Sequence, residues 1–290
     1  MRTVLVFNPS AGEGEQPVQA LTHELAAGGL TVAAFPSKEI VQALGEPADL
    51  VIVAGGDGTV TETALAMSGS SVPLAILPCG TANNLARALG GWSDAAALAA
   101  GWRDAASRPL SIADMRCGTE HRSFIEAVGF GAFAKAVRIA DRTGLKGVEA
   151  GRAAFAAALR EAAPLDLRLI LDGTEHRTST LLLEIMAVPQ FGPRLTLAAD
   201  LRAGEGQVAV VSLAPARRAE MEVWLERPDA APAPVECRLA SHVQVDWDGG
   251  ALRVDDAHMT IGAPCRLEVS LQEKTLRLMT PRETEMRCDR

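Results

Sequence analysis

Residues 55–59, with the sequence Gly-Gly-Asp-Gly-Thr, combine a permissive backbone with a single carboxylate. The glycines allow positive φ values and let the main chain approach a ligand with no Cβ atom in the way. A helix that begins here points its first N–H groups outward, where they bind anions such as phosphate. Because a carboxylate repels a phosphate unless a metal ion or a proton lies between them, Asp57 favours Mg²⁺-nucleotide chemistry over passive anion binding.

The flanking residues predict the elements that position this loop. Residues 51–54 are apolar, as in a buried strand, and the apolar residues after Thr59 follow helical spacing. Short β-type runs alternate with helical patterns throughout residues 1–112, which predicts a parallel sheet flanked by helices. The expected strands are 3–7, 31–35, 49–54 and 74–77, and the expected helices are 17–27 and 82–89.

Two further polar loops follow strands of the same predicted sheet, whose carboxyl ends are where such sheets bind ligands. They are Asn8-Pro-Ser-Ala-Gly12 and Pro78-Cys-Gly-Thr-Ala-Asn83. Backbone donors, hydroxyls and amides from the three loops are suited to hold phosphates, with Asp57 orienting Mg²⁺ or its waters. The candidate nucleotide-binding residues are Asn8, Gly12, Gly55, Gly56, Asp57, Gly58, Thr59, Glu62, Gly80, Thr81 and Asn83.

The sequence changes character at about residue 113. Helical patterns remain at 132–142 and 150–163, but β-type runs separated by turn signals dominate the rest. This pattern predicts a second, β-rich domain at 113–279, with residues 280–290 available to pack on the first domain. The expected strands are 165–171, 180–188, 207–213, 243–246, 266–271 and 275–279.

Composition excludes several classes of protein. The formal net charge of -8 argues against nucleic-acid binding. The five cysteines and five histidines lack ligand spacing, so neither a disulfide framework nor a zinc site is expected. The apolar run at the N-terminus is too short for a signal peptide, and no apolar run approaches ~18 residues. We therefore expect a cytoplasmic protein.

The motifs Asn8-Pro-x-x-Gly12, Gly55-Gly-Asp-Gly-Thr59 and Pro78-x-Gly-Thr-x-Asn83, in this order and spacing, resemble the diacylglycerol kinase catalytic domain of bacterial lipid kinases, sphingosine kinases and ceramide kinases. The resemblance extends over nearly the whole chain. It implies an α/β fold in which a Rossmann-like parallel-sheet nucleotide domain precedes a β-sandwich domain. It also implies ATP and Mg²⁺ as cofactors, and a lipid substrate met transiently at a membrane surface, such as the inner membrane face. A homodimer is left open.

The resemblance further implies a catalytic base in the second domain. The Val-Asp-Gly-Glu turn of the family matches residues 254–257, which makes Asp255 the base and Asp57 its catalytic partner in the first domain. The family's glycine and glutamate are Asp256 and Ala257 here, so a neighbour that tunes the base is missing. Asp246 or Asp248 is an alternative base, and a solvated turn pair is the alternative reading of Asp255 and Asp256.

Other departures keep a second function open. Glu205 replaces an aspartate associated with a structural Mg²⁺, which it can still ligate by reaching further. Asn84 and Gly131 also differ from many family members. The leading hypothesis is an ATP-dependent kinase for diacylglycerol or a similar lipid alcohol, and the alternative is a weak or inactive relative that binds nucleotide or lipid. An NAD kinase shares only residues 55–59, and the G-x-G-x-x-A match at 129–134 is interpreted as packing.

Overall fold

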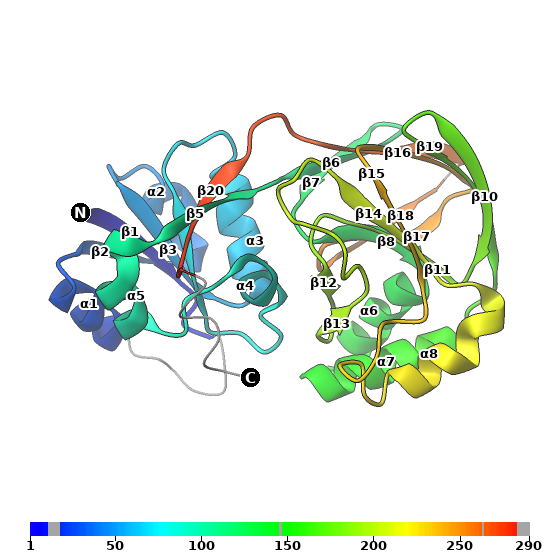
Figure 1. Cartoon of the computed structure of the whole chain (residues 1–290), viewed down its shortest axis with the longest axis horizontal. Coiled ribbons are helices and arrows are strands. Elements are labelled where there is room, and N and C mark those ends of the chain that lie inside the picture. The colour runs from blue at the N-terminus through cyan, green and yellow to red at the C-terminus, as the bar shows by residue number, and fades with distance from the viewer. Residues whose placement is uncertain (11–17, 145–146, 263, 283–290) are drawn as a thin grey trace. The chain divides into compact units, whose positions relative to one another are not determined.

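The computed structural model describes residues 1–10, 18–144, 147–262 and 264–282, which form two compact units. Unit 1 comprises Met1–Leu110 and the described part of Lys274–Arg290, and unit 2 comprises Ser111–Glu273 (Figure 1). Unit 2 is therefore an insertion in the chain of unit 1. The mixed α/β architecture, with a parallel sheet followed by antiparallel sheets, confirms the predicted fold class.

Unit 1 is built on a six-stranded sheet in the order β2-β1-β3-β4-β20-β5. All neighbours are parallel except β5, which runs antiparallel to β20. The interiors of β1, β3 and β4 are apolar, as expected for parallel strands that helices cover on both faces. The strands are β1 (Arg2–Phe7), β2 (Thr31–Pro36), β3 (Leu50–Gly55), β4 (Leu74–Pro78), β5 (Ala106–Leu110) and β20 (Leu276–Thr280).

Helices α1 (Val18–Ala27) and α5 (Ala95–Gly101) pack on the sheet face that carries Leu5, Ile52 and Leu77. The opposite face, which carries Val51, meets the other helices of the unit. They are α2 (Ile40–Ala43), α3 (Asp57–Ala66) and α4 (Asn84–Leu89), with a 3-10 turn at Ser37–Glu39 before α2. A second 3-10 turn, Trp102–Asp104, follows α5, and Trp102 packs with the cluster of the first face. The layers place the start of α3 and the loop before α4 at the carboxyl ends of β3 and β4.

Strand β20 corrects the expected domain boundary. Residues 275–279 were expected in the second domain, but β20 lies between β4 and β5 in unit 1. Leu276 and Leu278 are buried there, and the indole N–H of the buried Trp92 donates to the Met279 carbonyl at 2.9 Å. The alternating positions of Leu276 and Leu278 predict a strand, but they do not indicate which sheet the strand joins.

Unit 2 contains two antiparallel six-stranded sheets that enclose an apolar core. We call β10-β9-β16-β19-β6-β7 the outer sheet and β15-β14-β11-β8-β17-β18 the middle sheet. The outer-sheet strands are β6 (Ala113–Cys117), β7 (Glu120–Phe124), β9 (Leu165–Leu171), β10 (Thr174–Thr180), β16 (His242–Trp247) and β19 (Cys265–Leu271). The middle-sheet strands are β8 (Ala127–Gly131), β11 (Leu182–Met186), β14 (Val208–Ser212), β15 (Glu236–Ala240), β17 (Gly250–Val254) and β18 (Ala257–Ile261).

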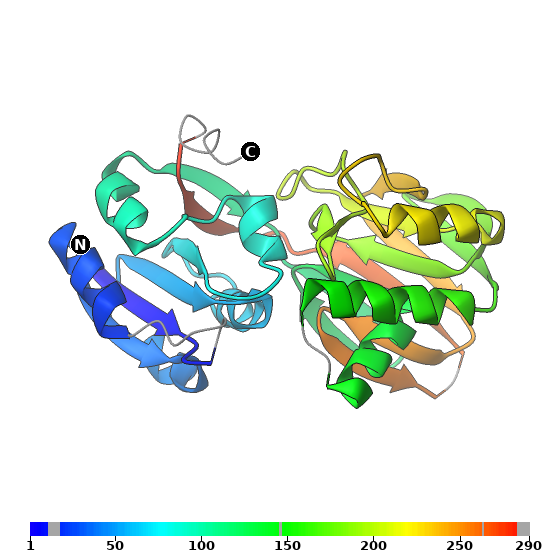
Figure 2. The same cartoon turned by 90° about the horizontal axis from the view of Figure 1, so that it is seen from below.

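A helical layer on the second face of the middle sheet adds to the expected sandwich (Figure 2). A second apolar cluster, which includes Phe133, Phe155 and Met186, lies between this sheet and the helices. The layer consists of α6 (Ala132–Thr143), α7 (Val148–Arg160) and α8 (Arg218–Trp224), a 3-10 turn at Pro215–Arg217, and a hairpin of β12 (Gln190–Phe191) and β13 (Leu195–Thr196). Both faces of the central strands β8, β11 and β14 are therefore buried.

The structure also contains a disulfide that the sequence did not predict. Cys117 of β6 and Cys265 of β19 are bonded across neighbouring strands, with their Cα atoms 5.9 Å apart. Wide sequence separation had hidden the pair, since its two members are 148 positions apart in the chain. Within the described ranges, no helix is long and apolar enough to span a bilayer.

Candidate functional site

The loop at residues 55–59 joins strand to helix, as predicted, but its glycines allow close packing and do not adopt positive φ values. β3 ends at Gly55, Gly56 is the N-cap of α3, and none of the three glycines has a positive φ. A Cβ atom on Gly55 would lie 2.6 Å from the Thr59 Cβ atom. The first turn of α3 is partly open to solvent, with Gly58 exposed and Asp57 partly exposed. Because the first N–H groups of a helix lack carbonyl partners within the helix, this end of α3 is suited to bind an anion.

The loops after β3 and β4 are locked together. A Cβ atom on Gly80 would lie 2.4 Å from the Gly56 Cα atom, so position 80 requires glycine, and a Cβ atom on Gly56 would make a tight contact of 3.2 Å with the Gly80 Cα atom. The Cys79 N–H donates to the Gly55 carbonyl at 2.9 Å. Asp57 Oδ1 accepts the Leu85 N–H at 2.9 Å, which makes Asp57 a cap for α4 as well as the first residue of α3. The two loops therefore form one rigid backbone cradle.

Three predicted phosphate ligands, Asn83, Asn8 and Thr59, form hydrogen bonds that hold the loops in shape. Asn83, at φ 54°, accepts the Gly80 N–H and donates to the Gly80 carbonyl, both at 2.8 Å. Asn8 donates to the buried Thr59 hydroxyl at 3.3 Å and accepts the Ser10 N–H at 3.0 Å. The side-chain polar atoms of the two asparagines, and the Gly80 N–H, thus form hydrogen bonds within the loops. The sequence does not reveal these partners.

The remaining candidates of unit 1 lie around this cradle. Thr81 and Glu62 are exposed, and Asp57 is partly exposed. Gly12 lies outside the described residues. No three His, Cys, Asp or Glu side chains gather as a metal site in the described part of the chain. Unit 1 therefore offers Mg²⁺ the Asp57 carboxylate, which suits an ion bound mainly by phosphate oxygens and water.

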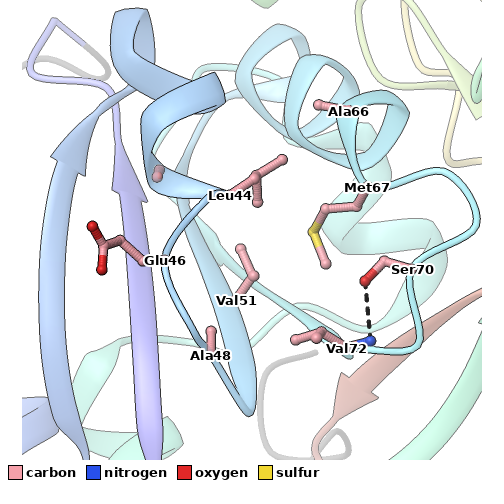
Figure 3. A pocket seen from close by; sticks show the side chains of 9 residues that line it. Leu44, Glu46, Ala48, Val51, Ala66, Met67, Ser70 and Val72 are labelled. Atoms are coloured by element: carbon pink, nitrogen blue, oxygen red, sulfur yellow. Dashed lines mark hydrogen bonds between the residues drawn. The ribbon is translucent and has the colours of Figure 1, made fainter.

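A separate pocket lies at the other end of the same strands (Figure 3). Leu44, Val51 and Met67 converge on it, and the Ser70 hydroxyl accepts the Val72 N–H at 3.1 Å. Its volume of about 130 Å³ is below that of nucleotide pockets, which start at about 300 Å³. This pocket therefore does not compete with the cradle as a nucleotide site.

Asp255 of unit 2 is buried, which excludes the solvated turn pair. Its Oδ1 accepts the N–H groups of Glu126 and Ala127 at 2.8 and 3.0 Å, and its Oδ2 accepts the Ile125 N–H at 3.1 Å. Asp255 has φ 47°, while Asp256 beside it is exposed. Since each carboxylate oxygen has two lone pairs, Oδ2 keeps one for a further proton donor.

Burial, rather than a neighbouring carboxylate, tunes this acid. It raises the pKa of Asp255 from its ordinary value of 3.8 to about 6, although three backbone N–H groups and Arg253 favour the ionised form. Ala257, where the family has glutamate, therefore does not leave Asp255 with the pKa of an exposed carboxylate. A pKa near 6 is suited to a general base at neutral pH.

The other carboxylates predicted in unit 2 fit their roles less well. Arg266 and Arg168 bind Asp246 at 2.8 and 2.7 Å and lower its pKa, which disfavours it as a base. Asp248 and Glu205 are exposed. Glu205 belongs to no described group of metal-binding side chains, so its role as a ligand stays a prediction.

Sequence reasoning missed a buried ion pair beside Asp255. Glu184 and Arg253 are both fully buried, and Arg253 Nη2 donates to Glu184 Oε2. The available signal was a glutamate inside the apolar strand at 182–186, because such an acid requires a buried partner. Gly129, which the dinucleotide-like pattern includes, makes room for the pair and so has a packing role.

Comparison with known proteins supports the domain assignment. Residues 2–115 match the family model of the diacylglycerol kinase catalytic domain. A diacylglycerol kinase of Mycobacterium tuberculosis is 31% identical over 153 residues, which is 50% of this chain and 48% of that protein. An uncharacterized protein of Synechocystis is 35% identical over 105 residues, or 24% of its own length. The chain thus spans half or less of the curated relatives it matches.

Solved structures match the fold over nearly the whole chain. A diacylglycerol kinase from Bacillus anthracis has a TM-score of 0.71 at 18% identity, with 98% of each chain covered. An NAD kinase from Archaeoglobus fulgidus, solved in complex with ATP, has a TM-score of 0.56 at 13% identity and covers 98% of this chain and 95% of that one. Together with the family match, these findings confirm the predicted resemblance to the diacylglycerol kinase catalytic domain, which the family model finds in residues 2–115.

Proposed function

We propose that the protein is an ATP-dependent lipid kinase that transfers the γ-phosphoryl group to the hydroxyl of diacylglycerol or a similar lipid alcohol. The observation that carries the proposal is that the segment matching the kinase family builds the interlocked cradle of Gly56 and Gly80. Such a lipid acceptor requires transient contact with a membrane surface. The NAD kinase alternative has only a likeness of fold behind it.

The cradle fits a nucleotide triphosphate. A Cβ atom at Gly80 would collide with the Gly56 backbone and force the two loops apart, and the N-terminal turn of α3 would supply N–H groups for phosphate oxygens. Asp57, already fixed by the Leu85 N–H, would hold Mg²⁺ on its partly exposed carboxylate. The ion supplies charge neutralisation to the phosphates when bound.

Asp255 completes the proposed chemistry. Its Oδ2 takes the proton of the lipid hydroxyl as the hydroxyl oxygen bonds to the γ-phosphorus and the bond to the β-phosphate oxygen breaks, releasing ADP. The three N–H groups of residues 125–127 fix the carboxylate, so no reorientation is needed when the hydroxyl arrives. This assignment makes Asp255 the acceptor-side residue and the cradle the donor-side element.

The test is transfer of label from ATP with Mg²⁺ into mixed micelles that contain diacylglycerol, monoacylglycerol, ceramide, sphingosine or phosphatidylglycerol, with NAD⁺ as a soluble acceptor. We expect a labelled lipid that is absent without Mg²⁺ and absent for Asp57→Ala. Label in NAD⁺ alone would replace the proposal with a soluble-substrate kinase. Mg²⁺-dependent ATP binding with no transfer to any acceptor would favour the inactive, nucleotide-binding alternative.

The raised pKa of Asp255 predicts opposite pH effects on rate and stability. The base acts deprotonated, so kcat should rise with pH through about 6. Asp255 has a pKa of about 6 in the folded protein and 3.8 in the unfolded chain, so the folded protein binds this proton more tightly. The resulting stabilisation of the folded state is complete below about pH 4 and is lost as pH rises through about 6. Rates and thermal unfolding at pH 4–8 check both trends. Asp255→Asn should lack both, and a wild-type rate in that variant would contradict the assignment.

A further inference from the structure

Glu184 and Arg253 meet across a gap that Gly129 provides. Glu184 of β11 and Arg253 of β17 are each in register with Gly129 of β8, the strand between them. A Cβ atom on Gly129 would lie 2.1 Å from Glu184 Oε2, so only glycine lets the side chains meet over this strand. Both side chains are fully buried on the helix-facing side of the middle sheet. Phe191, from the hairpin of β12 and β13, covers the guanidinium with its ring centroid 3.5 Å away.

Stability alone is a weak reason for such a pair. Burying two charges costs as much as their attraction returns, and apolar residues of similar volume often replace buried pairs without loss. Two polar atoms of this pair, Glu184 Oε1 and Arg253 Nε, are buried without a hydrogen-bond partner among the described residues. Such an arrangement indicates a role beyond packing.

Arg253 connects the pair to Asp255. Its Nη1 donates to the Asp255 carbonyl at 2.7 Å and approaches the Ala127 carbonyl at 3.4 Å. The Asp255 N–H donates to the same Ala127 carbonyl at 2.8 Å, and Asp255 has a left-handed φ of 47°. The guanidinium therefore touches both sides of the clamp in which the Asp255 carboxylate binds residues 125–127. Glu184, in turn, fixes where the guanidinium lies.

We propose that the buried Glu184–Arg253 pair is a positioning element that holds Asp255 in the geometry of a general base. The inference rests on the proposed kinase function and extends it to two residues that touch neither substrate. Arg253 is also the charged group that favours the ionised form of Asp255. The other charged or titratable groups on the elements around this turn are Glu126, Asp256, His258 of β18, and Lys135 and Arg138 of α6.

The experiment replaces the pair as a unit with Glu184→Leu/Arg253→Met, which preserves volume and leaves no lone buried charge. The matched control, Arg217→Gln/Glu220→Gln, removes an exposed ion pair at the start of α8 in the same unit. For each protein we would measure near-ultraviolet circular dichroism, kcat, the KM for ATP and the pH–rate profile. An NMR titration of the Asp255 carboxyl carbon measures the pKa of this group independently of catalysis. The resonance is assigned by its absence from the spectrum of Asp255→Asn.

We expect a folded double variant whose kcat falls by about 10- to 100-fold while the KM for ATP changes less than about twofold. The midpoints of the pH–rate profile and of the Asp255 titration should both move to higher pH, because the nearby positive charge is gone. The control should match the wild type. An unchanged kcat and titration would overturn the proposal, and so would a double variant that fails to fold, since the pair would then serve the fold itself. If the wild type transfers no phosphate, the kinase function fails, and the titration alone decides the positioning role.

Discussion

Asp57→Asn is expected to lower kcat/KM for phosphoryl transfer by about 100- to 1,000-fold with little loss of stability. In the wild type the Leu85 N–H donates to Asp57 Oδ1 at 2.9 Å. Asparagine keeps an oxygen that can accept this hydrogen bond, so the cap of α4 is retained. The variant lacks the negative charge that would hold Mg²⁺ at the cradle. Asp57→Ala should show the same loss of rate and, in addition, lose about 1 kcal/mol of stability with the cap.

Initial rates and chemical denaturation of both variants check this separation of roles. The control is Asp94→Ala, which removes the cap of α5, where Asp94 Oδ1 accepts the Ala97 N–H at 2.7 Å. It should lose about 1 kcal/mol of stability but retain the wild-type rate. Wild-type turnover by Asp57→Asn would mean that Asp57 serves only as a helix cap.

Gly129→Ala is expected to lower the free energy of unfolding by about 3–5 kcal/mol. The added Cβ atom would lie 2.1 Å from Glu184 Oε2 and push the carboxylate away from Arg253. Both charges would stay buried without adequate pairing, which is the costly way to disrupt such a pair. Gly129 has no positive φ, so the loss would come from the side-chain clash and not from backbone strain.

Urea denaturation of this variant, followed by far-ultraviolet circular dichroism, measures the effect. Gly262→Ala is the control, because a Cβ atom there meets nothing within 4 Å and its φ is not positive. It should change stability by less than about 0.5 kcal/mol. Equal stability of Gly129→Ala and the wild type would show that the Glu184 carboxylate has room to move without losing Arg253.

Local patterns in the sequence were enough to predict the framework of the cradle. The strand expected at 49–54 agrees within a residue with β3, whereas the helix expected from Thr59 begins two residues earlier, at Asp57. Apolar runs, glycine clusters and helical spacing are local consequences of burial, so they survive in a single sequence. The same holds for the carboxyl-end position of the loop after β4.

The partners of the polar side chains could not be read in the same way. Asp57 binds the N–H of a residue 28 positions later, and Glu184 meets Arg253 across 69 positions. Such partners are chosen by how closely loops and strands approach in three dimensions. Asn83 and Asn8 show a second reason, since the residue types that bind phosphate in a loop are also the types that hold a loop in shape.

The insertion of unit 2 into unit 1 sets an order on biosynthesis. Strand β5 pairs only with β20 in the described sheet, and 165 residues separate the end of one from the start of the other, as 276 minus 110 minus 1 gives. A ribosome therefore completes all of unit 2 before it delivers the strand that joins β5 to β4. Domains fold as units when their chain is available. Unit 2 can thus fold first, whereas the sheet of unit 1 is complete only after β20 has been synthesised.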